Sequence, residues 1–504
     1  MHPYEKRTFP PLNPQMAPRR IRRRLSWIVL VSLSAYLLFQ TSSTGRNKLR
    51  SAAAPLLGFL KCDGHSPGDW DLFYHLGGNG PWIPKINTVS YSEAVLPNAC
   101  RVDQVHMLSR HGERYPTRNA GARHLDLLDR LQGPQVTLRG ALSFLNSWTY
   151  FTSPTDPAFE NLTASGPYAG TLQAHNTGKL LRKRYDNLIP KNRRTKFWSC
   201  GSERDVETAQ KFADGFFGPN WTTDHSAELE VIPETEDRAG DTLTPGDTCY
   251  RYVRDGAQGH DAGYAKLGEW QAKFTKPIAE RLEQEANGIE FSMYDIYSMM
   301  EMCGFEILAR GASPWCEVFS HQEWLEFEYA RDVLHFYRAG PGNPYAGAMG
   351  WLWLNATRSL LLNESSEDAY FSFVHDGDIV PVLATLQVLN ELLIDQELPT
   401  DHVKTDRRWR TSDVVPMGGR LVLERVVCDH TEPIKTTRDH FVRLFINDGL
   451  VKLPGLQSAQ EIKHAVRLEL FQEFIGSRRD IFGDFRSVCS LSDDAPDRIT
   501  FLHQ

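Results

Sequence analysis

The chain has 504 residues, more than one hydrophobic core usually needs, so a large domain with an inserted unit, or two domains, is expected. Hydrophobic residues make up 41% and charged residues 24%, which is ordinary globular composition and excludes wholesale disorder. The formal net charge is −7 although the first 24 residues are strongly basic. The rest of the chain is therefore acidic, which argues against a nucleic-acid partner.

The N-terminal segment has the charge pattern of an export signal. Residues 1–24 form a basic tail, and residues 25–43 contain the apolar run WIVLVSLSAYLLF. Basic residues before such a run are typical of a cleaved signal peptide or of a signal anchor. The run is shorter than the roughly 20 residues that span a bilayer, whereas the long leader favours an anchor. Either alternative predicts the secretory pathway, with the body secreted or held in a membrane on its lumenal or extracellular side.

From residue 44 onward the composition predicts five segments. These are an irregular N-terminal wrap (44–100), an α/β domain in two parts (101–205 and 368–490), a mainly helical inserted domain (206–367) and a C-terminal tail (491–504). The wrap contains HLGGNGPW, residues 75–82, which has no following lysine and no helix start. We therefore interpret it as a turn that lets Trp82 pack, in preference to a phosphate-binding loop.

Short apolar runs predict the strands of the α/β part. RVDQVHMLS (101–109), RTKFWSC (194–200) and AYFSFV (369–374) each precede a polar turn and a helical pattern, and GGRLVLERVVC and HFVRLFIN add late strands. The predicted fold class is α/β, with a central mixed sheet, flanking helices and a smaller, mostly helical inserted domain.

Three helices have clear sequence signals. The first places Tyr168, Leu172, Leu180 and Leu181 at roughly helical spacing before Pro190. A second begins at the S-x-x-E capping box of Ser320 and Glu323 and ends before Gly340. A third is IVPVLATLQVLNELL (379–393), in whose first turn Pro381 is tolerated.

Polar exceptions gather in the three strand-to-helix turns. They are Arg110, His111 and Arg114 in RHGERYPT, then Arg204, then His375 and Asp376 in HDGD. In open α/β sheets ligands bind outside the carboxyl ends of strands, so we infer that these turns share one edge of one sheet. Taken singly, an arginine here is more often a surface charge and an aspartate a helix cap. The combination of these residues in three turns favours a ligand-binding site.

These residue types suit phosphoryl transfer. A neutral imidazole can attack phosphorus and form a phosphohistidine that water later hydrolyses. Arginine stays charged and offers a planar fork of donors to phosphate oxygens. Asp376 could protonate the leaving alcohol if burial raised its pKa, although nearby arginines would lower it.

RHGERYPT matches R-H-G-x-R-x-P, the signature of the histidine acid phosphatases, and the resemblance extends over about residues 75–490. CGSERDVETAQKFADGF, FSFVHDGDIVPVL and VRLFINDGLVKLPG are similar to further segments of fungal secreted acid phosphatases and fungal phytases. The resemblance implies His111 as the nucleophile and Asp376 as the proton donor. It implies Arg110, Arg114, Arg204 and His375 as phosphate ligands, and no metal or other cofactor.

The eight cysteines all follow the apolar run and lack zinc-site spacing, so an exported chain would use them in disulfides. The resemblance implies three pairs, Cys100–Cys428, Cys249–Cys489 and Cys303–Cys316. Cys62 and Cys200 remain, with a bridge between them as one alternative. N-x-S/T sequons predict glycans at Asn161, Asn220, Asn355 and Asn363.

The resemblance implies an acid phosphatase that acts on small phosphomonoesters. One alternative is a phytase or other inositol-polyphosphate phosphatase, and another is a non-catalytic phosphate-binding protein of the cell surface. Glu113 stands where fungal phytases usually have alanine, and a carboxylate beside the entrance would repel a highly phosphorylated ring, which favours small monoesters. The sequence leaves the natural substrate and the oligomeric state open.

Overall fold

The computed structural model describes residues 70–85, 88–153, 155, 157–363, 368–388, 397–431 and 436–504. The basic tail, the apolar segment 25–43 and Cys62 lie outside these residues, so the choice between signal peptide and anchor stays a prediction. None of the helices in the described residues is long and apolar enough to cross a membrane.

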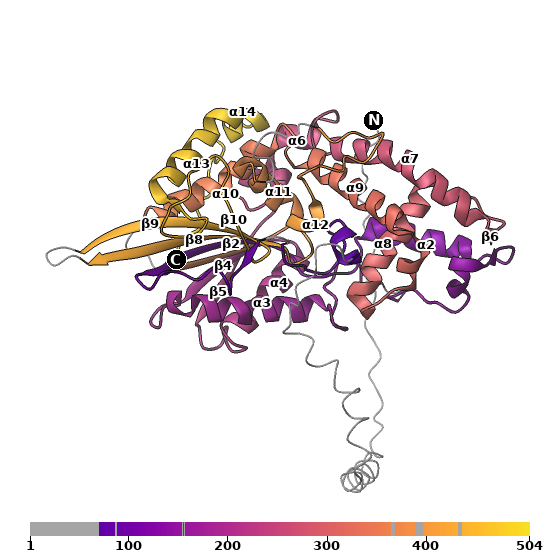
Figure 1. Ribbon diagram of the computed structural model, residues 1–504, viewed down its shortest axis with the longest axis horizontal. Coiled ribbons are helices and arrows are strands. Elements are labelled where there is room, and N and C mark those ends of the chain that lie inside the picture. Colours follow the sequence, from indigo (N-terminus) through magenta and orange to yellow (C-terminus); the bar gives the residue numbers. More distant parts are fainter. Residues whose placement is uncertain are drawn as a thin grey trace, which may run out of the picture. The chain divides into compact units, whose positions relative to one another are not determined.

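A nine-stranded mixed sheet carries the α/β part (Figure 1). Its strands, in spatial order, are β1 (Val89–Ser90), β10 (Gly449–Val451), β9 (Thr436–Ile446), β8 (Arg420–Thr431), β2 (Cys100–Arg110), β7 (Asp368–Val374), β4 (Thr195–Cys200) and β5 (Ala227–Ile232), and β11 (Val466–Arg467) also pairs with β9. Neighbours from β2 to β5 run parallel, whereas β8 is antiparallel to β2. The predicted mixed sheet is confirmed.

Helices cover both faces of this sheet (Figure 1). One face carries α3 (Gly170–Tyr185) and α4 (Glu203–Phe216), and the other carries α10 (Ala346–Leu361), α11 (Asp376–Leu386) and α13 (Leu468–Phe482). The helix predicted before Pro190 is confirmed as α3, although Leu172 and Leu180 are 43% and 44% exposed. A Cβ at Gly178 would lie 2.2 Å from the carbonyl oxygen of Phe212, so small residues let α3 approach α4 closely.

A helical group lies beside the sheet (Figure 1). It contains α2 (Arg118–Leu131), α7 (Ala262–Glu283), α8 (Met293–Arg310) and α9 (His321–Arg338). The predicted start of α9 is confirmed, since the Ser320 hydroxyl accepts from the Glu323 amide and the Glu323 carboxylate accepts from the Ser320 amide. The domain boundaries stay a prediction, but β5 and most of α4, which fall in the range 206–367, belong to the sheet layers.

The remaining α-helices and strands of the described residues are short. They are β3 (Thr137–Leu138), β6 (Ala286–Asn287), α5 (Pro245–Thr248), α6 (Tyr250–Arg254), α12 (Thr411–Val414) and α14 (Phe485–Cys489). Strands β3 and β6 pair with each other in a separate two-stranded sheet.

Helix α11 differs from its predicted form. It begins at Asp376, so Pro381 is its sixth residue and lies in the interior, where the missing N–H removes one intrahelical hydrogen bond. It ends at Leu386, and Gln387 adopts a left-handed φ of 54°. The early start matters for the site, because it places Asp376 in the first turn, where the last residues of β7 lead into the helix.

The three disulfide pairs that the resemblance implied are present. Cys100–Cys428 joins β2 to β8, Cys249–Cys489 joins the segment before α6 to α14, and Cys303–Cys316 spans 13 residues beside α8. Cys62 lies outside the described residues, so the alternative of a bridge between it and Cys200 stays a prediction. Among the described residues Cys200 is buried and in no disulfide. Its thiol instead lies 3.6 Å from Nε2 of His375.

Replacing Cys100 and Cys428 with alanine is expected to destabilise the protein more than replacing Cys303 and Cys316. The first bridge closes a loop of 328 residues and the second a loop of 13, and chain-entropy arguments give about 6 and about 3 kcal/mol respectively. Guanidinium unfolding of the two double variants, followed by far-UV circular dichroism, checks the order. An equal loss of unfolding free energy in both variants would contradict the prediction, because the entropy that the unfolded chain gains would then not depend on loop length.

Candidate active site

The site lies at the carboxyl ends of four neighbouring parallel strands. β2 leads into Arg110–Arg114, β7 into His375 and Asp376, and β4 into Arg204, while β5 adds Glu234. All six residues predicted from the sequence come together there. Nη2 of Arg110 lies 2.9 Å from Oδ2 of Asp376, and Nη2 of Arg204 lies 3.2 Å from Nδ1 of His375. The rings of His111 and His375 are 6.2 Å apart, centroid to centroid. The inferred common edge is confirmed.

His111 is buried in its neutral form. Its Nδ1 lies 2.9 Å from the carbonyl oxygen of Gly112, which can only accept, so Nδ1 carries the proton. Nε of Arg114 approaches Nε2 at 3.4 Å and donates to it. Burial holds the pKa of His111 well below its usual value, and the charges of Arg110, Arg114 and Arg204 lower it further. Nε2 therefore keeps its lone pair even in mildly acidic solution.

The glycine-rich turn at residues 75–82 accepts a hydrogen bond from Arg110. Nη1 of Arg110 donates to the carbonyl oxygens of Gly78 and Val415, each at 2.7 Å. Gly77 has a left-handed φ of 56°, and a Cβ there would lie 2.2 Å from the side chain of Arg331. The turn also brings Trp82 against Arg420, whose guanidinium carbon lies 4.6 Å from the ring centroid. The sequence predicted the packing of Trp82 but not the contact with Arg110.

Two buried donors in the site have no hydrogen-bond partner within the described part of the protein. They are Nε of Arg110 and Nε of Arg204. Buried N–H groups are nearly always paired in folded proteins. Arg114 adds a third guanidinium, whose burial and proximity to Arg110 lower its pKa to about 9, so it is charged at neutral and acidic pH. The arrangement can hold an anion against His111.

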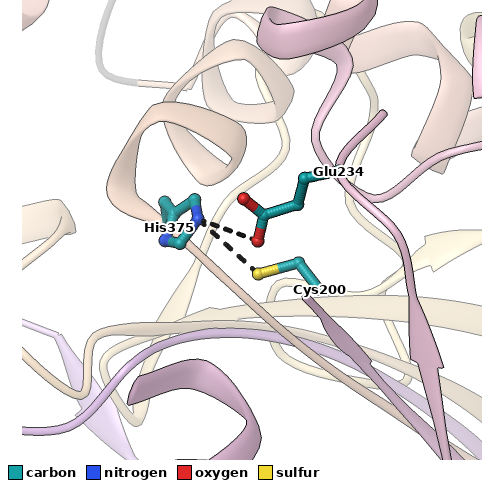
Figure 2. Close-up of side chains that lie close together, drawn as sticks. All are labelled: Cys200, Glu234 and His375. Atoms are coloured by element: carbon teal, nitrogen blue, oxygen red, sulfur yellow. Dashed lines mark hydrogen bonds and ion pairs between the residues drawn. The ribbon is translucent and has the colours of Figure 1, made fainter. Parts of the chain in front are cut away.

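Figure 2 shows His375 beside the carboxylate of Glu234 and the thiol of Cys200. Its Nδ1 lies 3.0 Å from Oδ2 of Asp205, and its Nε2 lies 3.4 Å from Oε1 of Glu234. Burial disfavours the charged ring, but Asp205 and Cys200 outweigh it and raise the pKa of His375 well above its usual value. The ring is therefore an imidazolium that can donate to an anion.

Asp376 is a carboxylate with its present neighbours. Burial alone would raise its pKa, as the proton-donor role requires, but Arg110 and His335 outweigh burial and lower the pKa well below the usual value. Arg338 contributes in the same direction, with Nη1 3.7 Å from Oδ1 of Asp376. Of the two opposing effects expected from the sequence, the arginines prevail. A nearby anion would shift the balance back, because negative charge disfavours a second carboxylate.

Sequence reasoning missed the contribution of α9. Arg331, His335 and Arg338 lie on one face of this helix, and their spacing of four and three residues was a signal that could have been read. Nη2 of Arg331 lies 3.1 Å from Nε2 of His335, and Nε of Arg331 donates to the carbonyl oxygen of Gly77 at 2.9 Å. Asp205 and Glu234 were missed as well, although Asp205 directly follows Arg204.

The predicted position of Glu113 at the entrance was wrong. Glu113 is fully buried, and its Oε1 accepts from the backbone amide of Trp82 at 3.0 Å. Burial raises its pKa to about 7. A carboxyl group that faces the interior and is largely protonated in acid cannot repel a phosphorylated ring from the entrance. The charge argument against phytate therefore fails.

Replacing Glu113 with glutamine is expected to stabilise the protein at alkaline pH but not in acid. The pKa of Glu113 rises from 4.5 in the unfolded chain to about 7 when folded, so between these values the folded state holds a proton that the unfolded state has lost. Wild-type stability therefore falls as pH rises through this window, by about 3 kcal/mol, and the glutamine variant escapes the loss. Unfolding free energies at pH 4 and pH 8 check this. A difference between variant and wild type that does not change with pH would contradict it.

Comparison with known proteins finds acid phosphatases and phytases. The chain is 32% identical over 398 residues to an acid phosphatase of Komagataella pastoris, covering 77% of this chain and 81% of the relative. It is 28% identical over 437 residues to a phytase of Candida albicans, covering 86% and 90%. The crystal structure of the phytase from D. castellii superposes with a TM-score of 0.77 at 25% identity, covering 88% of this chain and 93% of that one.

The family follows from these matches. A multiple inositol polyphosphate phosphatase of Bifidobacterium longum shares the fold at 15% identity, with a TM-score of 0.58. Residues 101–447 match the histidine phosphatase superfamily, branch 2, and this range contains all six residues that the sequence singled out. The resemblance noted in RHGERYPT is confirmed, and the chain belongs to the histidine phosphatase superfamily, branch 2.

Proposed function

We propose that the chain hydrolyses phosphate monoesters through a phosphohistidine on His111. As a member of this family with acid phosphatases and phytases among its relatives, the chain is a phosphomonoester hydrolase that works at acidic pH. The mechanism and the role of each residue are the proposal. The observation that carries it is a buried, neutral imidazole whose Nε2 lies 3.4 Å from Nε of Arg114 and whose pKa is lowered by the charges of Arg110, Arg114 and Arg204.

In the first step Nε2 of His111 attacks phosphorus, the N–P bond forms, and the bond from phosphorus to the ester oxygen breaks. Arg110, Arg114 and Arg204 hold the phosphate oxygens, and the unpaired Nε groups of Arg110 and Arg204 suit this role. His375 donates to a further oxygen as an imidazolium. In the second step water attacks the phosphohistidine, the N–P bond breaks, and phosphate leaves.

Asp376 supplies the proton that the leaving alcohol needs. A bound dianion disfavours the Asp376 carboxylate and draws the arginine charge to itself, so the pKa of Asp376 rises when substrate binds. Acidic solution favours the protonated acid, whereas His111 stays neutral there because its pKa is low. Activity is therefore expected to fall toward alkaline pH, as Asp376 loses its proton.

Phytate is a second candidate substrate. The phytase of C. albicans and the fold of the D. castellii phytase favour it, and the burial of Glu113 removes the electrostatic argument against it. We propose small phosphomonoesters as the first substrate class and phytate as a second candidate.

Phosphate release from p-nitrophenyl phosphate and from phytate, measured on the same protein across acidic pH, tests function and specificity together. The proposal predicts turnover of p-nitrophenyl phosphate whether or not phytate is a substrate. Comparable kcat/KM values for the two esters would make phytate a substrate as well. Failure with both esters would favour the alternative of a non-catalytic phosphate-binding protein. Activity that survives a chelator would support catalysis without a metal.

We propose that the body of the chain is exported. Three disulfides among the described residues suit an oxidising compartment. Of the sequons, Asn161, Asn220 and Asn363 are exposed, whereas Asn355 is half-buried in α10 and is the least accessible glycan site. N-terminal sequencing of the exported protein would decide between a cleaved signal and an anchor at residues 25–43.

A further inference from the structure

Three side chains with metal-binding atoms converge at one edge of the proposed active site. Cys200 ends β4, Glu234 follows β5 and His375 follows β7, so three neighbouring strands deliver them. Sγ of Cys200, a carboxylate oxygen of Glu234 and a ring nitrogen of His375 all lie within 4.8 Å of one another. Figure 2 shows the thiol and the carboxylate pointing toward the same edge of the imidazole ring.

Two of the separations between these atoms match edges of a zinc tetrahedron. Sγ of Cys200 lies 3.6 Å from Nε2 of His375, and Oε1 of Glu234 lies 3.4 Å from the same nitrogen. With Zn–S bonds of about 2.3 Å and Zn–N or Zn–O bonds of about 2.0–2.1 Å, a tetrahedral ion needs separations of about 3.5 Å and about 3.3 Å. Both separations from Nε2 of His375 therefore suit a tetrahedral ion, and the sulfur and the carboxylate oxygen lie within 4.8 Å of each other.

Two of these three side chains have polar partners that can hold them in position. Nδ1 of His375 lies 3.0 Å from Oδ2 of the fully buried Asp205, which orients the ring and leaves Nε2 for a metal. Such a carboxylate is the usual partner of a metal-binding histidine. Glu234 accepts from the backbone amide of Ser202 at 2.8 Å and from its hydroxyl at 3.2 Å. Cys200 is in no disulfide.

We propose that Cys200, Glu234 and His375 bind a borderline-soft divalent cation such as Zn²⁺, with water as the fourth ligand. A thiolate beside an imidazole selects zinc over magnesium or calcium, which prefer oxygen ligands alone. On binding, the thiol proton of Cys200 and the Nε2 proton of His375 pass to solvent, and no electron is transferred. The ion is an addition to the phosphatase machinery and takes no part in its bond-making steps.

The regulatory consequence rests on the proposed function. His375 is shared, since it is both a proposed phosphate ligand and a proposed zinc ligand. With Nε2 on the metal, the ring keeps one N–H, at Nδ1, which lies 3.0 Å from Oδ2 of Asp205, and the ring can no longer donate to the phosphate from Nε2. Zinc binding and phosphate binding therefore oppose each other. We expect zinc to raise KM for a phosphate monoester and a chelator to reverse the effect.

Titration of the untagged, full-length protein with Co²⁺ tests the site without reference to activity. A thiolate bound to Co²⁺ gives a near-ultraviolet charge-transfer band, which is expected to saturate at one Co²⁺ per chain and to disappear when Zn²⁺ is added. Cys200→Ser is expected to abolish the band. Asp205→Asn is expected to keep it but to weaken binding about 10–100-fold, because it disturbs only the support of His375.

Two control variants test whether another cysteine or histidine binds the Co²⁺. Cys62→Ser is expected to keep the band, as is His402→Ala, which removes an exposed histidine beside Asp401. Absence of a thiolate band in the wild type, or its survival in Cys200→Ser, would overturn the site. A saturable band in a protein without phosphatase activity would leave the site standing and reject the proposed function. A band without any rise in KM would reject the regulatory consequence.

Discussion

Replacing His111 with alanine is expected to lower kcat for p-nitrophenyl phosphate by roughly 10⁴-fold or more, the scale on which covalent enzymes lose activity with their nucleophile. The loss is large because the change removes the atom that bonds to phosphorus, whereas the arginines can still bind the ester. KM is expected to change much less than kcat. Steady-state release of p-nitrophenol by wild type and variant measures both.

His106 offers a matched control on the same strand. It is as buried as His111, but its ring stacks on Tyr370 with centroids 4.6 Å apart and its Nε2 lies 2.8 Å from Oε1 of Gln104. His106→Gln is therefore expected to affect stability but to keep kcat near the wild-type value. If His111→Ala folds and keeps about a tenth of the wild-type kcat, His111 is not the nucleophile.

Trapping the intermediate separates a nucleophile from a phosphate ligand. Wild-type protein mixed with ³²P-labelled ester and quenched in alkaline denaturant is expected to retain label, because the N–P bond of phosphohistidine breaks in acid but survives base. His111→Ala is expected to retain none. Wild-type protein that hydrolyses the ester without retaining label would favour direct attack by water.

The strands and the turns of the site were predictable because their signals are local. β2, β4 and β7 are apolar runs in the sequence, and the polar residues that follow them must lie at one edge once the strands are parallel. The motif RHGERYPT then added the family. The edge itself was an inference, and the pairing of β7 with both β2 and β4 confirms it.

Other features were not predictable because they depend on what a residue meets in the folded protein. Glu113 follows His111 and Gly112 in a polar turn, yet it points inward to the Trp82 amide. The buried face of α3 is set by the close approach of Gly178 to α4, which no apolar pattern records. The sequence did not predict strand β5. Glu234 could be placed in the site only once β5 was seen to pair with β4.

Replacing Asp376 with asparagine is expected to produce a loss that depends on the leaving group. For an alkyl phosphate, kcat should fall by about 10²–10⁴-fold, the usual contribution of a general acid. For p-nitrophenyl phosphate the fall should be much smaller, because p-nitrophenolate leaves without a proton. The variant should also bind the phosphate dianion more tightly, since the pocket loses a negative charge 2.9 Å from Arg110. Measuring kcat and KM for a series of esters of rising leaving-group pKa checks the fall in kcat and the tighter binding.

The pH profile gives the same residue a second, independent test. The wild type should lose activity on alkyl phosphates toward alkaline pH as Asp376 loses its proton, and this limb should vanish in Asp376→Asn. Asp378→Asn is a matched control, because Asp378 lies in the same first turn but accepts from the His375 amide at 3.1 Å. It should keep the limb and the wild-type dependence on the leaving group. Equal losses for alkyl and aryl esters in Asp376→Asn would mean that Asp376 orients Arg110, and the proton would then have to come from another group.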